Sequence, residues 1–484
     1  MGRWRTVVIV GAATVLAACS TPSSTSRERD VSRDVAFTGC DVVKCSDTIN
    51  GAPYEIVMPS RWNGTLLIYS HGYRGAQPEP PSFEPVSTTP EPAPGWGSGI
   101  KGLGQALLNQ GYAIAGSAYA SNGWAVADGV RADEDLHSFF VDNIGTPSRV
   151  YVWGDSLGGL ITEQVAERNP DWVSGAAPLC GVLAGVLPNY DLALDVSYAV
   201  KMLIDPDMKL TGYTSYEDAV KTLTVASKKV IAAASDTTGG GTAKVMFIAS
   251  LVDAPHQTQR FDGATLTSQV SGYTEAIITA LGFGTLGRYD VERRYDGNIS
   301  SNEGVDYAAR ISESDAALVD AVTPNASATF TAQLQAGVRV VADPAARSAA
   351  LAEGGDPQGQ VHAPTITMHT AADPLVIVQN ESFFRARYRA QQAKGNVQAD
   401  LVQLFTVAPA AYPATPGAPF GAGHCNFTPE SRLAVISLLD QWVREGIVPT
   451  GGLLTTELPP TQTGYEPLYE PGPWPEPAAV ATRS

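Results

Sequence analysis

Short apolar runs alternate with segments of helical spacing over the first third of the chain. Five runs are rich in apolar, β-branched and aromatic residues and have the length of buried strands: 54–58, 65–70, 112–116, 149–153 and 173–180. Between them, apolar residues recur at helical intervals over 100–110, part of 125–141, and 159–168. Strands that alternate with helices predict a mostly parallel sheet covered by helices.

The alternation stops after Cys180 and returns near residue 361. The residues between have mainly helical spacing, as at 191–203, 215–229 and 305–322. Beyond them the sequence predicts strands at 365–369 and 399–406 and helices at 374–395 and 428–445.

We therefore expect an α/β fold with one core, made of 37–180 and 361–450, and a large, mainly helical cap insertion over 181–360. A cap of this kind covers a site and shapes its pocket. The alternative is an independent second domain with its own function. Residues 451–484 form a proline-rich C-terminal tail, and within it 459–484 are expected to have little helix or strand.

The first residues have the pattern of an export signal. Arg3 and Arg5 precede an unbroken apolar run at 6–16, which is too short to span a bilayer. The sequence then reads Leu-Ala-Ala-Cys and resembles the end of a bacterial lipoprotein signal. The resemblance implies removal of residues 1–18, lipidation of Cys19, and a lipid-anchored protein of the cell envelope. The alternative is an ordinary secretory signal with a chance cysteine.

The charge of the chain limits its partners. The formal net charge is −17, which argues against nucleic acid and against electrostatic binding to an anionic membrane. We expect contact with a membrane only through the lipid. Residues 19–36 are largely polar and predict a flexible tether between that lipid and the folded body.

Residues 154–158 carry the most informative motif, Gly-Asp-Ser-Leu-Gly. A predicted strand precedes it and a predicted helix follows it, which is the arrangement of a nucleophile elbow. Glycines beside Ser156 let the backbone turn sharply, and the helix directs its positive end toward the serine. The alternative is a glycine-rich turn without chemistry.

A serine hydroxyl needs a base, a group that orients the base, and donors for an oxyanion. His424 stands between the last predicted strand and the last helix, and Asp373 follows the strand at 365–369. The order serine, acid, histidine is that of this arrangement. The alternatives are a helix-capping role for His424 and a turn role for Asp373, with Asp191 and Asp195 as weaker candidates for the acid.

Two backbone N–H groups complete the predicted site. One belongs to Leu157, directly after the serine. The other belongs to Tyr73, in the sequence Ser-His-Gly-Tyr after the strand at 65–70. Both are expected to stabilise the oxyanion.

Together these residues resemble the α/β-hydrolase superfamily, in particular its secreted serine esterases and peptidase-like members, over 37–180 and 361–450. The His-Cys pair at 424–425 is also similar to the tannase and feruloyl esterase group, where a cysteine after the histidine is disulfide-bonded beside the nucleophile. In that group the partner cysteine directly precedes the serine. Here this position is Asp155, so the likeness is partial and does not fix the substrate.

Four cysteines follow Cys19, which suggests two disulfides with three possible connectivities: Cys40, Cys45, Cys180 and Cys425. Cys40 and Cys45 are close enough in sequence for a local loop. This leaves Cys180 and Cys425, which in an α/β-hydrolase both lie at the catalytic edge of the sheet. The alternative for this second pair is two buried free thiols.

The sequence therefore predicts an exported serine hydrolase that cleaves small-molecule or polymeric carboxylic esters through an acyl-enzyme. No cofactor or metal is expected, because no zinc spacing or nucleotide-binding glycine motif is found. One alternative is an exported aminopeptidase whose cap carboxylates hold the substrate's amino terminus, with three candidates: Glu313, Asp315 and Asp320. Another is a non-catalytic binding protein of the same fold. A GDSL-type esterase using Asp253 and His256 is disfavoured because its motifs would stand at the wrong places in the chain.

Overall fold

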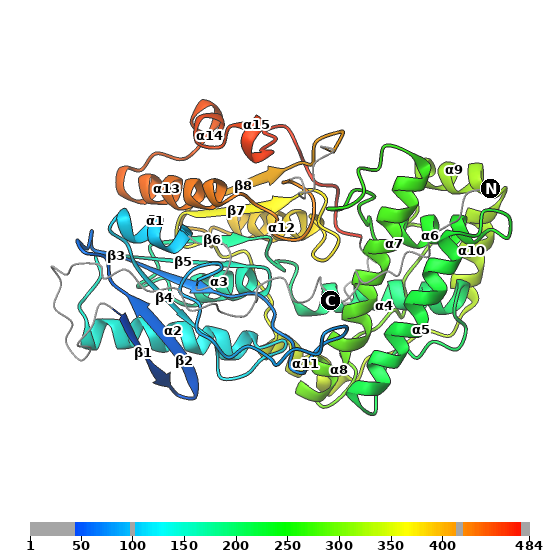
Figure 1. Ribbon diagram of the computed structural model, residues 1–484, viewed down its shortest axis with the longest axis horizontal. Coiled ribbons are helices and arrows are strands. Elements are labelled where there is room, and N and C mark those ends of the chain that lie inside the picture. Colours follow the sequence, from blue (N-terminus) through cyan, green and yellow to red (C-terminus); the bar gives the residue numbers. More distant parts are fainter. Residues whose placement is uncertain (1–43, 97–101, 413–419, 476–484) are drawn as a thin grey trace.

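An eight-stranded sheet lies at the centre of the computed structural model, which describes residues 44–96, 102–412 and 420–475 (Figure 1). In spatial order its strands are β1 (Lys44–Ile49), β2 (Ala52–Val57), β4 (Ala113–Ser117), β3 (Thr65–Ser70), β5 (Arg149–Asp155), β6 (Gly175–Leu179), β7 (Thr365–Thr370) and β8 (Leu401–Thr406). β2 is antiparallel to both of its neighbours, and the other pairs are parallel. This order, with one reversed second strand and a β3–β4 exchange, is the α/β-hydrolase fold that the sequence predicts.

Helices cover both faces of the sheet. Alternate residues of β3 point to opposite faces, so Ile68 packs beneath α2 (Val126–Asn143) and α3 (Leu157–Arg168). Leu67 packs on the other face with α1 (Leu103–Asn109) and α13 (Pro429–Glu445). Every residue of β3 is buried, which explains why the strand has a continuous apolar pattern and no alternation.

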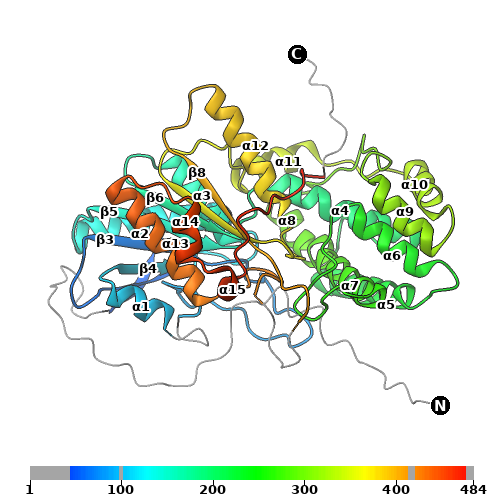
Figure 2. The same ribbon diagram turned by 90° about the horizontal axis from the view of Figure 1, so that it is seen from above.

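The residues between β6 and β7 form a helical insertion, which we call the cap. Its elements are α4 (Val186–Leu203), α5 (Tyr216–Ala234), α6 (Gly241–Ser250), α7 (Leu266–Gly282), the π-helix η1 (Phe283–Gly287), α8 (Arg288–Arg294), α9 (Glu313–Val322), α10 (Ala326–Ala336) and α11 (Pro344–Glu353). Figures 1 and 2 both show most of these helices gathered beside the sheet. They bury their own apolar cluster, which includes Phe247, Ile277 and Phe330.

Two helices begin later than their spacing predicts. The helix expected from residue 305 begins at Glu313, because the Ser312 hydroxyl accepts the N–H of Asp315 and caps it there. The helix expected from residue 374, α12, runs over Gln379–Ala393. The Asp373 carboxylate accepts two N–H groups of the preceding turn and holds that turn out of the helix.

Strand β1 and the C-terminal segment complete the described chain. β1 has mostly exposed or half-buried side chains, so it lacks the apolar run that marks the other strands. After α13 come two short helices, α14 (Gly451–Glu457) and α15 (Pro460–Thr463), and Trp474 packs against Phe383 of α12.

Several predictions fall outside the described residues and remain predictions. They concern the signal peptide (1–18), Cys19, the tether (19–36) and the pairing of Cys40 with Cys45. Among the residues that the structure does describe, none of the helices is both long and apolar enough to span a bilayer.

Candidate active site

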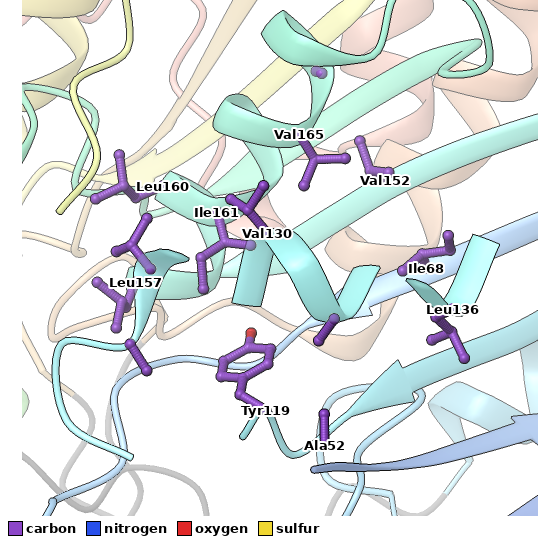
Figure 3. Close-up of a cluster of buried hydrophobic side chains, with 14 of the residues drawn as sticks. Ala52, Ile68, Tyr119, Val130, Leu136, Val152, Leu157, Leu160, Ile161 and Val165 are labelled. Carbon is purple, nitrogen blue, oxygen red and sulfur yellow. The ribbon is translucent and has the colours of Figure 1, made fainter. Parts of the chain in front are cut away.

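Ser156 occupies a strained turn between β5 and α3. Its backbone has φ 61° and ψ −122°, which a residue with a side chain rarely adopts. Its N–H donates to the carbonyl of Leu179 at the end of β6, at 2.9 Å. Behind it, α3 is fixed by Leu160, Ile161 and Val165, which Figure 3 shows within the apolar core. The turn is thus held from the strand side and from the helix side.

The glycines around Ser156 are required by the close approach of two backbones. A Cβ atom on Gly158 would lie 1.9 Å from the carbonyl oxygen of Ser70, and one on Gly154 would lie 2.5 Å from the same oxygen. A Cβ on Gly72 would lie 3.3 Å from the Cβ of Ser156. The loop after β3 therefore lies directly against the serine.

The two predicted oxyanion donors lie on either side of this contact. Leu157 is the first residue of α3, where helix N–H groups have no partner within the helix. Tyr73 follows Gly72, and its half-buried ring lies beside Phe283 of the cap, with centroids 6.0 Å apart. Within the described residues, neither N–H donates to a protein acceptor. Both are free to donate to a ligand.

Asp373 and His424 form a hydrogen bond of 2.7 Å between Oδ2 and Nδ1. Asp373 is fully buried, and its Oδ1 accepts the N–H groups of Leu375 and Val376 at 2.9 and 3.0 Å. Burial favours the neutral acid, but the charges of His424 and His369 and the hydrogen bond of His424 outweigh it and hold the pKa of Asp373 well below its usual range. The carboxylate is therefore ionised and fixes the imidazole.

The loop that carries His424 is tied to the loop that carries Asp373. Ala372 and Ala422 form a parallel bridge, and the N–H of Gly423 donates to the carbonyl of Ala372 at 2.8 Å. The Thr370 hydroxyl donates to the carbonyl of Gly423, also at 2.8 Å. The distance between acid and histidine is thus set by backbone contacts.

A disulfide joins Cys180 to Cys425, the pair that the sequence favours, with Cα atoms 5.4 Å apart. Cys180 follows Leu179, which accepts the N–H of Ser156, and Cys425 follows His424. The Cys425 Sγ lies 3.3 Å from His424 Nε2. The disulfide therefore links the end of β6, where the Leu179 carbonyl binds the Ser156 N–H, to the loop that carries His424. As disulfide sulfurs, the two cysteines do not offer the thiolates that bind zinc.

Ser156 and His424 do not form a hydrogen bond in this structure. Among the hydrogen bonds of the described ranges, none joins the Ser156 hydroxyl to His424. Such bonds are often long in ligand-free enzymes and tighten when substrate binds.

One contact of the site has no signal in the sequence. Arg432 on α13 forms an ion pair with the carboxylate of Asp155, and its other nitrogen donates to the carbonyl of Cys425 at 3.0 Å. The Tyr69 hydroxyl donates to Asp155 at 3.0 Å. Asp155 occupies the position at which the tannase and feruloyl esterase group has its cysteine. In this chain, the Asp155–Arg432 ion pair connects the serine turn to the histidine loop.

The other candidate residues lie elsewhere. Asp191 and Asp195 are on α4 in the cap and form ion pairs with Arg347 and Arg310. His71 is buried and stacks on Tyr119, with ring centroids 4.0 Å apart. Burial, and then the charge of Arg74, lowers the pKa of His71 well below its usual range, so it is a neutral residue beneath the site.

The two residues of the GDSL-type alternative lie in the cap loop between α6 and α7. The ring of His256 contacts Tyr273, and Asp253 is a separate, exposed acid of the same loop. This loop also reaches the site, since a Cβ on Gly423 would lie 2.7 Å from Gln259 Nε2. It therefore covers the histidine loop from the cap side.

An apolar cavity of about 50 Å³ lies between the core and the cap. Its core side includes Leu375 and Val376, whose N–H groups hold Asp373. Its cap side is formed by α4, α7, η1 and the loop after α6, through residues such as Ala193, Ala276 and Phe283. The cavity thus adjoins the turn of the acid.

Comparisons with known proteins find distant structural likenesses. No protein-family model matches the chain, and no curated protein sequence does. An esterase from Aspergillus oryzae matches with TM-score 0.37 and 14% identity, over 89% of this chain and 86% of that one. Feruloyl esterase B from Aspergillus oryzae matches with TM-score 0.36 and 16% identity, over 85% of this chain and 82% of that one. Proline iminopeptidase from Mycobacterium smegmatis matches with TM-score 0.35 and 13% identity, over 84% of this chain and 100% of that one. Values this low say nothing about substrate, and the fold is identified from the strand order and connections above.

Proposed function

We propose that the chain is a serine hydrolase that cleaves carboxylic esters through an acyl-enzyme. Ser156 attacks the carbonyl carbon, and His424 accepts the hydroxyl proton. The imidazolium then protonates the leaving alcohol, and neutral His424 activates a water that releases the acid. Asp373 orients the imidazole and stabilises its charged form. The N–H groups of Leu157 and Tyr73 stabilise the oxyanion.

The observation that carries this proposal is the strained turn at Ser156 beside a bonded Asp373–His424 pair. Strain in a non-glycine residue persists only where its surroundings enforce it, and it gathers at functional sites. Cys180 and Cys425, at the same edge of the sheet, also have positive φ, of 43° and 50°. A binding protein of this fold would have no need for the buried acid–histidine pair.

The apolar cavity beside Asp373 supports an apolar acyl group of limited length. A site for one water-sized group takes roughly 10–15 Å³ of such space, so this cavity accepts about three to five carbon-sized groups. Short-chain esters are the substrates that we expect to be cleaved fastest.

Export and lipid anchoring belong to the same proposal. The Cys180–Cys425 disulfide supports an oxidising compartment, since such bonds form and persist outside the cytoplasm. The lipid would be attached at Cys19.

An aminopeptidase remains the second candidate, but the predicted cap carboxylates give it little support. Asp315 accepts a hydrogen bond from Ser312 at the start of α9, and Asp320 accepts two from Ser327. Figure 1 shows α9 at the outer end of the cap. These carboxylates stabilise helix ends.

Turnover of two substrate classes tests the proposal. A soluble form lacking residues 1–19 is assayed with p-nitrophenyl esters of two to eight carbons and with aminoacyl p-nitroanilides. We expect ester turnover that is greatest for short acyl chains and that is lost in Ser156→Ala. Anilide turnover alone would favour the peptidase, and turnover that survives in Ser156→Ala would exclude this site.

A further inference from the structure

Behind the acid of the site lies a second, fully buried histidine, His369. It stands near the end of β7, four residues before Asp373, and has no exposed surface. Its Nε2 donates to the carbonyl of Val376 at 2.8 Å and lies 3.6 Å from Asp373 Oδ2. This Asp373 oxygen is the one that binds His424, so the carboxylate stands between two imidazoles.

The other nitrogen of His369 faces a buried carboxylate. Its Nδ1 lies 3.3 Å from Oε1 of Glu381 on α12, which is also fully buried. The second oxygen of Glu381 accepts the Thr367 hydroxyl and the Gln403 amide, both at 2.6 Å. These bonds fix the carboxylate in place and use its remaining acceptor capacity.

Acceptors at both nitrogens require a doubly protonated ring. A carbonyl oxygen only accepts, and so does an ionised carboxylate, so Nε2 and Nδ1 both carry protons. Burial alone would lower the pKa of His369, but the carboxylates of Asp373 and Glu381 beside the ring outweigh burial and raise this pKa to about 10. The ring is then a cation throughout the neutral range.

The positive charge of the His369 ring is balanced by the acids that lie beside it. Asp373 and Glu381 are the two acids that face the ring. The next acid is Glu163 of α3, which is buried. Burial, and then the charges of Glu167 and Glu381, raises its pKa well above the usual range, so it is neutral. The charged groups therefore follow one another in the order Glu381, His369 and Asp373, and Asp373 contacts His424.

We propose that His369 and Glu381 are positioning residues that set the charge of Asp373 and, through it, the basicity of His424. This inference rests on the proposed function. The positive ring offsets part of the charge of Asp373, so His424 binds a proton less readily and stays a free base to lower pH. Glu381 keeps the ring charged by supplying its counter-ion.

The pH dependence of kcat/KM tests this role, because its acidic limb reports protonation of the base. In His369→Gln the offsetting charge is gone, so the acidic limb moves to higher pH by about 0.5–1 unit. In Glu381→Gln the buried ring loses its counter-ion and its extra proton, so the limb moves in the same direction. The two changes remove one coupled unit, and the double variant shifts no further than either single one.

Matched variants separate positioning from packing. Glu167→Gln neutralises a half-buried carboxylate, one that accepts three backbone N–H groups of residues 358–360, and His137→Gln replaces a histidine that stacks on Trp172. Neither contacts Asp373, and we expect the limb of both to match the wild type. A loss of kcat in His369→Gln or Glu381→Gln at every pH, with the limb unmoved, would overturn the proposal.

A measurement on the wild-type protein does not depend on variants that fold. With ¹⁵N-labelled histidine, the His369 ring is identified by its contact to Val376 and followed from pH 6 to 8.5. The proposal requires two protonated ring nitrogens over this range, and a neutral ring would contradict it. If wild type cleaves neither esters nor anilides, the proposed function fails, while the state of this ring is still decided by the spectrum.

Discussion

The core edge and the cap both bury charged pairs, but they use them differently. At the core edge, Asp155 and Arg432 lie between the serine turn and the histidine loop, and a disulfide spans the same gap. In the cap, Asp195 and Arg310 are equally buried, with 1% and 4% of their side chains exposed, yet they join cap segments to each other. Similar interactions thus hold the candidate active site in one region and a scaffold in the other.

Under the proposed function, this difference places the chemistry in the core and the specificity in the cap. The core fixes Ser156, Asp373 and His424 by backbone bonds that leave little freedom. The cap contributes apolar side chains to the cavity beside Asp373, and Gln259 to the surface over Gly423. Changes in the core should therefore abolish turnover, and changes in the cap should redistribute it among substrates.

The largest effect is expected at the acid of the core. Asp373→Asn keeps the size of the side chain but removes its charge, so His424 loses the partner that holds its tautomer and stabilises its cation. We expect kcat to fall by about 10⁴-fold. Ester turnover at saturating substrate measures it, with Asp191→Asn in the cap as the control. A fall below tenfold in Asp373→Asn would contradict the assignment of the acid.

The buried ion pairs give the sharpest comparison of the two regions. Arg432→Met and Arg310→Met each leave a buried carboxylate without its partner, which costs on the order of 3–5 kcal/mol of stability. Only Arg432→Met should also lower kcat, by about tenfold or more, since it loosens the serine turn and the histidine loop. Denaturant unfolding and ester turnover are compared side by side. Equal losses of activity in the two variants would remove the distinction between the regions.

Removal of the disulfide should cost less stability than either ion pair. The double variant Cys180→Ser/Cys425→Ser frees the histidine loop from β6, and we expect a loss of about 2–4 kcal/mol. Activity should fall and recover partly at lower temperature, where the loop is better held by its backbone bonds. Thermal unfolding and turnover at two temperatures measure this. Unchanged stability would mean that the bond does not restrain the loop.

The smallest effect is expected in the cavity. Ala276→Leu on α7 adds three carbons to its wall and should reduce kcat/KM for butyryl esters by about tenfold, with acetyl esters little affected. Ala219→Leu, at another buried alanine of the cap outside this wall, is the control for overpacking. If both variants change the ratio of the two substrates alike, the cavity is not the acyl site.

The sequence predicts the core well because its signals are local. The strand, glycines and helix around Ser156 occupy consecutive residues, and Asp373 and His424 each follow a strand. The contact between Asp155 and Arg432 joins residues 277 apart, and no local pattern marks it. In the sequence, His369 is one residue of a predicted strand and Glu381 is one residue of a predicted helix, and no pattern marks them as partners. The helix starts at 313 and 379 depend on side-chain bonds that spacing does not encode.

Covalent labelling of the serine tests the central claim most directly. The soluble protein is treated with a fluorophosphonate, and the modified residue is located by peptide mass spectrometry. Our account predicts one adduct, on Ser156, which is absent in Ser156→Ala and forms at least 10³-fold more slowly in His424→Ala. An adduct on another serine, or ester turnover by a folded protein whose Ser156 stays unmodified, would contradict it.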